Sequence, residues 1–469
     1  MNRTLPLVLA VALFMEHMDS TVIATALPAI AADLGTNPIS LKLALTAYLV
    51  SLAIFIPISG WMADRYGARN VFRGALFVFM VGSLLCAVSN SLGFFVFARF
   101  VQGMGGAMMT PIARLVLVRA TPRSELVNAM AWLTIPALIG PLLGPPVGGF
   151  ITTYVSWHWI FIINLPIGVA GILMAGLVLP EIAGGVRRRI DWRGFVLVAL
   201  AASGLVFGLS VISLPALPPL VGVAVTLVGL AAAAAYIRHS ARVPDPILNL
   251  ALFRHRTFTA AITGGSLFRV GTGAVPFLLP LMFQLIFGLS PFQSGLLTFV
   301  TALGALSMKF LASRALRAAG FRTVTIASAA LGGALIAAMA LFTADTPYPA
   351  IVATLITGGF MRSLFFTSTN ALTFADIDDD QAGQATAILA SAQQISIALG
   401  VACAGGLLEL VTVVGGGGLD RSAFVVAFLV AGGVAMLSAV VFLRLPRDVG
   451  SAVSGHRLKA GSQRPEIQE

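Results

Sequence analysis

Two carboxylates lie inside the first apolar stretch of the chain, at about residues 5–31. Glu16 and Asp19 are three residues apart, so a helix places them on one face, with Ser20 beside them. A rise of about 1.5 Å per residue puts them near the middle of a hydrocarbon core of about 30 Å. A carboxylate at that depth is costly unless it is protonated, paired or hydrated. We predict that this pair exchanges protons, as a proton-driven carrier requires; a structural hydrogen-bonding pair is the alternative.

Three arginines also lie within apolar stretches: Arg99 in the fourth, Arg269 in the ninth and Arg362 in the twelfth. An arginine at such depth needs a carboxylate, or backbone carbonyls that a proline has freed, as its partner. Arg99 is followed by Gln102 and three glycines. For the other two arginines, two roles stay open, namely binding an anionic substrate group and countering the acidic residues. The residues that we predict to line a substrate cavity are Ser20, Arg269, Gln284, Arg362 and Asn370.

A charged segment connects the second and third apolar stretches. Its sequence is Gly60-Trp-Met-Ala-Asp64-Arg65-Tyr-Gly67-Ala-Arg69. Glycine permits close packing and a tight turn, while Asp64 can pair with arginines or face the N-terminus of a helix from elsewhere in the chain. We predict that this segment is part of a gate that breaks during a conformational cycle; a plain charged loop is the alternative.

Glycines and prolines accumulate in the middle of the fifth apolar stretch. The segment contains Gly140, Pro141, Gly144, Pro145, Pro146, Gly148 and Gly149. Three of the glycines recur every four residues, so a helix aligns them in a row that a neighbouring backbone can approach. The prolines lack an N–H and should bend the helix. We predict a bent, grooved helix at a moving contact surface, the alternative being the ordinary abundance of glycine and proline in membrane helices.

The composition is typical of a helical membrane protein. Of the 469 residues, 58% are hydrophobic and 10% are charged, and apolar runs of about 18 residues or more recur from end to end. The strict alternation of a β-barrel is missing. The net charge of +11 fits the basic cytoplasmic loops of a membrane protein, so we expect a lipid bilayer and no nucleic acid as partner. Two cysteines in apolar stretches and five scattered histidines indicate no disulfide framework and no metal site.

About 20 residues per crossing predict an all-α polytopic protein with fourteen spans. They lie at about residues 5–31, 42–62, 71–90, 93–117, 129–152, 157–179, 194–212, 217–237, 257–286, 292–312, 323–343, 349–373, 382–411 and 423–444. Alternate connections are rich in arginine, whereas the others hold little beyond Lys42 and Arg421, so the first set and both termini should be cytoplasmic.

The spans divide into two sets of six, which is a recurrent plan of transporters. We predict an N-terminal six-helix bundle at 1–180, a two-helix insert with cytoplasmic linkers at 181–256, a C-terminal six-helix bundle at 257–446 and a disordered cytoplasmic tail at 447–469.

Taken together, these residues resemble the major facilitator superfamily and, within it, the fourteen-helix drug:proton antiporters of bacteria. Residues 60–69 look like the superfamily's motif between the second and third helices, and residues 99–106 are similar to its fourth-helix motif. Residues 140–149 resemble the fifth-helix antiporter motif, and residues 18–28 the first-helix motif of drug antiporters. Segments typical of the fourteen-helix group are matched at 157–168, 191–194, 248–258 and 280–284.

The resemblance implies two six-helix bundles plus two extra helices, with transport by alternating access. It makes Asp19 the leading proton-coupling residue and Arg99 its partner. Glu16 is not assigned by the resemblance; we include it as a proton-coupling residue only because of its depth in the first span. It also implies that Asp64 stabilises a gate at the N-terminus of a helix in the second half. The corresponding loop of the second half, at residues 309–322, has no acidic residue that matches Asp64, so a symmetric second gate is not expected.

The fifth-helix motif indicates direction, because within the superfamily it marks exporters. The superfamily plan sets residues 140–149 against the second half, and we expect the tenth span as the partner through Gly295 and Gly304. The leading hypothesis is therefore a proton-coupled multidrug exporter of small amphipathic compounds. Its alternatives are an exporter of an endogenous metabolite or siderophore and a non-transporting membrane sensor.

We further expect a multi-pass protein of the bacterial inner membrane that works as a monomer. The proton motive force drives it without a cofactor. A membrane enzyme is the weakest hypothesis, because no nucleophile, metal or base constellation lies at depth.

Overall fold

The computed structural model describes residues 4–122, 125–181, 190–212, 218–308, 311–378, 381–416 and 418–446. Within these ranges no β-strand occurs, and fourteen helical spans are long and apolar enough to cross a membrane. The predicted all-α fold and the predicted number of spans are confirmed. The predicted tail at 447–469 lies outside the described residues.

The first six spans are built from nine helices. They are α1 (Thr4–Val22) with the 3-10 turn η1 (Ile23–Thr25) and α2 (Leu27–Asp33), α3 (Lys42–Phe55) with α4 (Ser59–Tyr66), α5 (Ala68–Ala87), α6 (Leu92–Ala120), α7 (Leu126–Tyr154), and α8 (Trp159–Ile162) with α9 (Asn164–Val178). Despite its four internal prolines, α7 is one helix, so the prolines do not end it.

The remaining eight spans follow in regular order. They are α10 (Trp192–Ile212), α11 (Pro219–Ser240), α12 (Arg256–Leu281) with the π turn η5 (Met282–Ile286), α13 (Pro291–Met308), α14 (Ala312–Ala338), α15 (Tyr348–Thr373), α16 (Ala382–Val414) and α17 (Arg421–Leu443). Further 3-10 turns lie at Pro38–Leu41, Ile56–Ile58, Leu250–Arg254 and Met339–Leu341.

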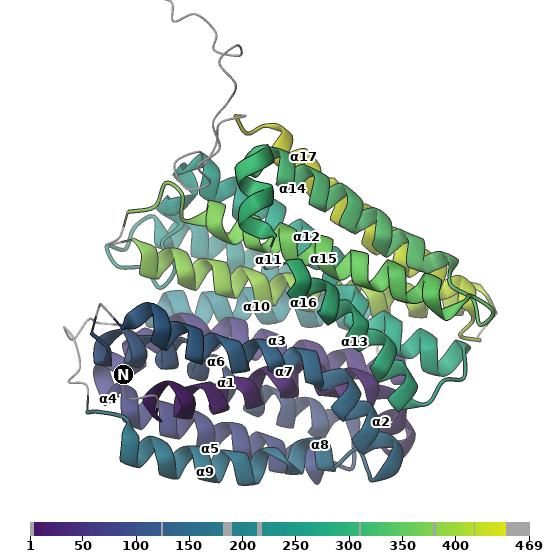
Figure 1. Cartoon of the computed structure of the whole chain (residues 1–469), viewed down its shortest axis with the longest axis horizontal. Helices are drawn as coiled ribbons and strands as arrows, with labels where there is room; N and C mark the ends of the chain where they lie inside the picture. Colours follow the sequence, from purple (N-terminus) through teal and green to yellow (C-terminus); the bar gives the residue numbers. More distant parts are fainter. Residues whose placement is uncertain are drawn as a thin grey trace, which may run out of the picture.

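The spans form two stacked halves (Figure 1). Helices α1 to α9 make one half and α12 to α17 the other, and we call the contact surface between them the seam. Lipid is as apolar as the helix faces, so close packing of small residues holds such bundles together. Gly82 of α5, for example, packs directly on the backbone of Gln102 of α6, and Gly271 of α12 on the carbonyl of Ala431 of α17.

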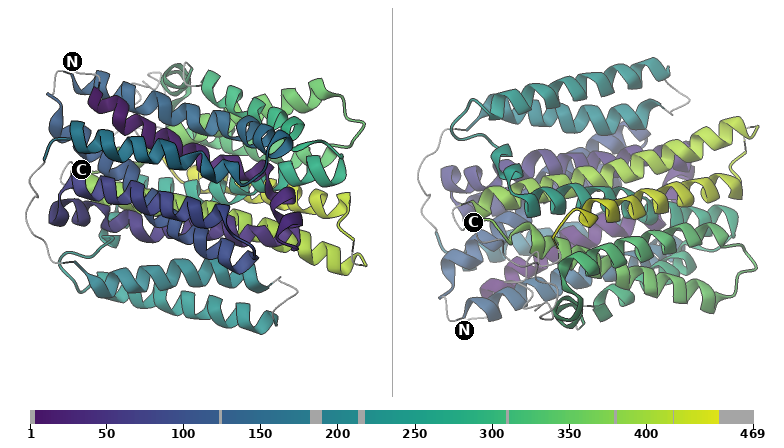
Figure 2. Two further views of the ribbon diagram at one scale, coloured as in Figure 1. Left: turned by 90° about the horizontal axis from the view of Figure 1, so that it is seen from below. Right: turned by 90° about the horizontal axis from the view of Figure 1, so that it is seen from above.

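Helices α10 and α11 form a separate pair along one side of the molecule (Figure 2). Gly204 of α10 and Gly229 of α11 face each other, with no room for a side chain on either. Val206 of α10 belongs to an apolar cluster with Val50 of α3 and Ala398 of α16. The pair therefore covers the seam on the side where the two halves meet through α3 and α16.

The two ends of the bundle differ in charge. One end, which we call the arginine-rich end, holds Arg65, Arg119, Arg193, Arg238, Arg256, Arg314 and Arg444 at the tips of its helices. The described connections at the opposite end hold neither lysine nor arginine. Because the number of spans is even, the chain enters its first span and leaves its last span at the arginine-rich end.

The seam is closed toward the opposite end. Gly295 of α13 packs on the backbone of Pro145 and Pro146, and Gly149 of α7 packs on Pro291 and Phe292. The expected contact between the fifth and tenth spans is thus present at Gly295. Gly304 does not take part in it, because it packs on Ile356 of α15 within its own half.

Candidate functional site

A buried ion pair joins the first and fourth spans. Arg99 donates to Asp19 at 2.7 Å between Nη1 and Oδ2, and the two side chains are 1% and 0% exposed. The other carboxylate oxygen accepts the amides of Gln102 at 2.9 Å and Asn164 at 2.8 Å. Ser83 extends the network by accepting from both amides. All three groups that contact the carboxylate are hydrogen-bond donors, so they satisfy the acceptor oxygens of this buried side chain.

Glycines place α6 close enough for this network. A Cβ on Gly103 would lie 2.7 Å from the carbonyl oxygen of Tyr48 in α3, and one on Gly105 would lie 2.5 Å from the amide nitrogen of Phe79 in α5. Only glycine permits both approaches. The guanidinium of Arg99 then lies over the ring of Tyr48, at 4.3 Å from its centroid, where a cation–π contact adds to the ion pair.

Glu16 has partners of its own. Its carboxylate lies 2.7 Å from Nδ1 of His17 and accepts from the hydroxyl of Thr110 at 3.2 Å. The side chain of His17 is 31% exposed, compared with 8% for Glu16. The hydroxyl of Ser20 donates to the carbonyl of His17 in its own helix. The first helix therefore has a sealed carboxylate at Asp19 and a second one, Glu16, next to an accessible imidazole.

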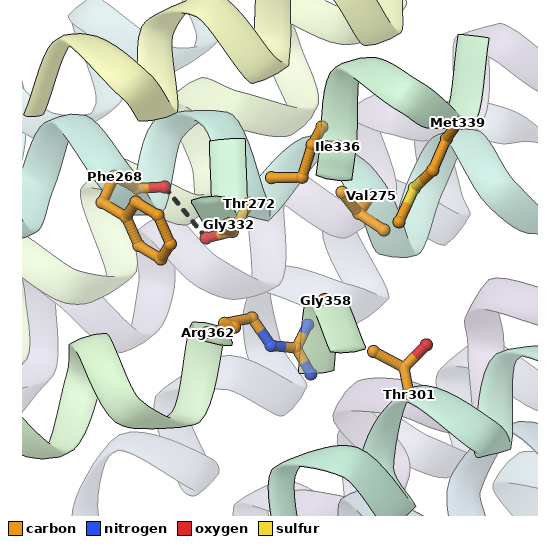
Figure 3. A pocket seen from close by; sticks show the side chains of 9 residues that line it. All are labelled: Phe268, Thr272, Val275, Thr301, Gly332, Ile336, Met339, Gly358 and Arg362. Atoms are coloured by element: carbon orange, nitrogen blue, oxygen red, sulfur yellow. Dashed lines mark hydrogen bonds between the residues drawn. The ribbon is translucent and has the colours of Figure 1, made fainter. Parts of the chain in front are cut away.

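In the second half, two cations lie in the middle of their spans. Arg269 is 5% exposed, donates to Oδ1 of Asn370 at 3.2 Å and lies 4.5 Å from the ring centroid of Phe366. Arg362 points toward a small void between α12, α13, α14 and α15 (Figure 3). The structure thus brings Arg269 and Asn370 together and places Arg362 on the same helix as Asn370.

Gln284 lies apart from these residues. Its side-chain amide donates to the carbonyl of Thr25 at 3.0 Å, across the seam and near the opposite end. It is fifteen residues beyond Arg269, which corresponds to about 22 Å along a helix. The five residues predicted to line one cavity therefore fall into three places: Ser20 on α1, the group of Arg269, Arg362 and Asn370, and Gln284 at the closed part of the seam.

The loop motif at residues 60–69 forms the turn that its glycine predicts. Gly67 has a φ of +83°, which only glycine adopts without strain, and Gly60 lies exposed about two turns earlier. Asp64 pairs with Arg119 of the same half at 3.3 Å. Arg69 contacts Glu181 at 3.4 Å and the carbonyl of Gly176, while the side chain of Arg65 is exposed. The predicted docking of Asp64 to a helix of the second half stays a prediction.

The fifth-helix motif packs on the helix that holds the two carboxylates. A Cβ on Gly140 would lie 2.8 Å from the carbonyl of Phe14, and one on Gly144 would collide with the side chain of Thr21. Gly148 approaches the carbonyl of Val22 in the same way. The glycine row therefore faces α1 of its own half, and only the neighbouring face, with Pro145, Pro146 and Gly149, meets α13.

Sequence analysis missed a buried ion pair across the seam. Lys42, interpreted as a loop residue, is the first residue of α3 and is fully buried, and its Nζ lies 2.6 Å from Oε2 of Glu409 in α16. Glu409 is the one charged residue between Ala382 and Val414, and that isolation in an apolar span is the signal that could have revealed it. Among the described residues, no three His, Cys, Asp or Glu side chains gather as a metal site would require.

Comparison with known proteins identifies the superfamily to which the chain belongs. The sequence profile of the Major Facilitator Superfamily matches residues 9–237 and 261–465. The chain belongs to this superfamily. A relative from Citrobacter koseri, named "Putative multidrug resistance protein MdtD", is 35% identical over 460 residues, which cover 97% of either chain. "Probable transport protein HsrA" of Haemophilus influenzae is 39% identical over 408 residues, covering 87% of this chain and 88% of the relative.

Solved structures of the superfamily share the fold at low sequence identity. The D-xylose-proton symporter has a TM-score of 0.68 at 15% identity, over 95% of this chain and 98% of its own. The POT family transporter PepTSo has a TM-score of 0.70 at 13% identity, over 94% of this chain and 97% of its own. The chain is therefore a multi-pass membrane transporter and not an enzyme.

Proposed function

We propose that this transporter is a proton-coupled antiporter that exports small amphipathic compounds from a bacterial cell. It works as a monomer in the inner membrane by alternating access, and the proton motive force drives it without a cofactor. The arginine-rich end faces the cytoplasm, as the positive-inside rule requires, so both termini are cytoplasmic.

The observation that carries the proposal is the sealed ion pair of Asp19 and Arg99. A charged pair in hydrocarbon is stable only while it stays intact, since separating it leaves two buried charges. A proton delivered to Asp19 neutralises the carboxylate and thereby breaks its ion pair with Arg99. Because this pair holds α1 against α6, protonation of Asp19 is coupled to the movement of α1 relative to α6. Glu16 and His17 lie three and two residues away, with the more exposed imidazole as the entry point for that proton.

Export is supported by the partner of this helix. The glycine row of the fifth-helix motif packs on α1 between Phe14 and Thr25, the segment that contains both carboxylates. A protonation that displaces α1 must therefore also displace α7, which meets the second half at Pro291 and Gly295. Two of the relatives named above are called a multidrug resistance protein and a transport protein, which agrees with export of foreign compounds.

The test measures proton movement in everted membrane vesicles from a strain that lacks other exporters. A panel of amphipathic cations, anions and neutral compounds is added to energised vesicles, and release of lumenal protons is followed with a pH-sensitive dye. We expect the wild type to release protons with at least one compound and Asp19→Asn to release none. Asp420→Asn is the matched control, because Asp420 is exposed and asparagine can replace it as the N-cap of α17.

The variant Glu16→Gln distinguishes the role of Glu16 from that of Asp19. If Glu16 passes the proton on to Asp19, the variant releases protons more slowly but still does so, whereas loss as complete as that of Asp19→Asn would make Glu16 a coupling residue in its own right. Proton release by Asp19→Asn at the wild-type rate, with equal expression, would rule out the proposed mechanism.

A further inference from the structure

In the described part of the second half, the buried Arg269 and the partly exposed Arg362 place positive charge inside the spans, and no free carboxylate lies there to match it. In its described part the carboxylates are Asp345, Asp376, Asp378, Glu409 and Asp420. Four of these lie in connections or at a helix cap, and Glu409 pairs with Lys42. Arg269 has only an amide and an aromatic ring as polar or cation–π partners, and Arg362 makes no hydrogen bond or ion pair with another described residue.

Both arginines are associated with one face of α15: Arg362 belongs to it, and Arg269 of α12 contacts it. Arg362, Phe366 and Asn370 recur every four residues, so they lie above one another on one face of the helix, with about 6 Å between successive positions. Arg269 reaches this row from α12, over the ring of Phe366 and to the amide oxygen of Asn370. The guanidinium of Arg269 thus lies over Phe366, and Arg362 is one turn before Phe366 on the same helix.

A void adjoins Arg362. Phe268, Thr272 and Val275 of α12 line it together with Thr301 of α13, residues of α14, and Gly358 and Arg362 of α15 (Figure 3). Its volume of about 20 Å³ accommodates one or two small groups such as the oxygens of a carboxylate, but no whole drug-sized molecule. Gly358, one turn before Arg362, has no side chain to fill the space beside the guanidinium.

Arginine cannot escape the cost of this position by losing its proton, as a lysine or a carboxylate can. A guanidinium in an apolar region therefore needs an anion for at least part of the cycle. Two sources exist: a carboxylate of the first half that approaches in another conformation, or the substrate. The planar fork of arginine binds a carboxylate through two parallel hydrogen bonds, which favours an organic acid as the substrate.

We propose that Arg362 and Arg269 bind the anionic group of an amphipathic organic anion, with Phe366 and Phe268 in contact with its apolar body. The inference rests on the proposed export function and names the class of compound that it moves. Asn370 holds Arg269 in place and adds an amide for a second acceptor oxygen. Amphipathic cations find no counter-charge on this face and are not substrates of this site.

The first test measures binding to the purified, full-length protein in detergent, without transport. The probes are 1-naphthoate, 1-naphthalenesulfonate and decanoate, with 1-naphthylmethylamine as the cation of matched size. We expect the anions to raise the melting temperature of the wild type and the amine to leave it unchanged. In Arg362→Gln and Arg269→Gln the anions should bind about thirtyfold more weakly or worse, because a buried charge pair is lost.

The matched control is Arg256→Gln, which removes an exposed arginine from the first turn of α12. It should bind the anions as the wild type does. Arg362→Lys keeps the charge but not the fork, so it should retain part of the affinity, which a variant that merely misfolds would not. Absence of anion binding to the wild type, or equal binding to Arg362→Gln, would overturn the proposal.

The second test repeats the vesicle experiment with the same probes. If the amine evokes proton release and the anions do not, the substrate class is wrong while the antiport function stands. If Arg362→Gln abolishes proton release with every compound, cations included, the arginine serves as the partner of a carboxylate in the cycle, and the proposal fails. If the anions bind but nothing evokes proton release, the antiport function fails and the anion site remains.

Discussion

Asp19 is a fully buried carboxylate in the first span of this protein. Three donors surround it, and its side chain has no contact with solvent. The family resemblance implied Arg99 as its partner, whereas the depth of the arginine alone left a carboxylate and freed backbone carbonyls open as partners. The sequence did not predict Ser83 and Asn164, because neutral side chains in apolar spans are common and their direction depends on how helices rotate.

The strength of this pair can be measured as a double-mutant cycle. Arg99→Leu leaves a buried carboxylate unpaired and should lower the free energy of unfolding by about 3–5 kcal/mol. The double variant Asp19→Asn, Arg99→Leu should recover much of that loss, since no charge remains. Reversible unfolding in mixed detergent micelles gives the four values.

Arg119→Leu is the comparison, because its pair with Asp64 is 37% and 32% exposed. That substitution should cost less than about 1 kcal/mol, as for other exposed pairs. Equal losses at Arg99 and Arg119 would mean that burial adds nothing to the Asp19 pair.

For the helix α7, the sequence predicted the groove but not the helix that packs in it. The four-residue spacing of its glycines predicted a groove for another backbone, and that prediction holds. The partner was not predictable from spacing alone, because a helix has several faces and the glycine row occupies only one. The row meets α1, while the prolines between the glycines turn toward α13.

A large side chain at Gly144 should block the movement of α7 against α1. In Gly144→Leu the first added carbon already meets the hydroxyl and Cβ of Thr21, so we expect loss of proton-coupled turnover with the protein still in the membrane. Turnover in the vesicle assay and the amount of folded protein by size-exclusion chromatography measure the two effects.

Gly433→Leu on α17 is the control, because nothing lies within 4 Å of a Cβ at that position. Gly144→Leu combined with Thr21→Ala should recover part of the turnover, since the nearest atom is removed. Normal turnover in Gly144→Leu itself would mean that α1 and α7 separate freely.

For the whole molecule, the decisive contact is the pair of Lys42 and Glu409, which are 367 positions apart in the chain. Hydropathy predicted the fourteen spans, because the length of each follows from the thickness of the bilayer. The conformation in which the halves meet could not be predicted in this way. It depends on individual contacts between residues of the two halves. The sequence around one residue of such a contact does not indicate which residue of the other half is its partner.

Lys42→Met should favour the conformation that is open at the opposite end. The variant leaves Glu409 buried without its partner, a loss of about 3 kcal/mol that changes the ratio of the two conformations about a hundredfold. Spin labels at Asn90→Cys and Ala344→Cys, in connections of the two halves, report the change as an added population at longer distance. Cys86→Ser and Cys403→Ser provide the background.

The exchange variant Lys42→Glu, Glu409→Lys should restore the short distance, because it keeps the pair with its charges reversed. An unchanged distance distribution in Lys42→Met would show that the packing of Gly149 and Gly295 alone holds this end shut.

The pair α10 and α11 makes the molecule asymmetric toward its lipid. On its side, α10 stands between the acyl chains and the line where α3 and α16 meet (Figure 2). On α7, by contrast, no further helix pair covers Ile135, Ile139 and Phe150, whose side chains are exposed on the surface of the molecule. Along α3 and α16 the seam is therefore covered by an added helix pair, whereas along α7 and α13 it is closed by the direct packing of Gly149 and Gly295.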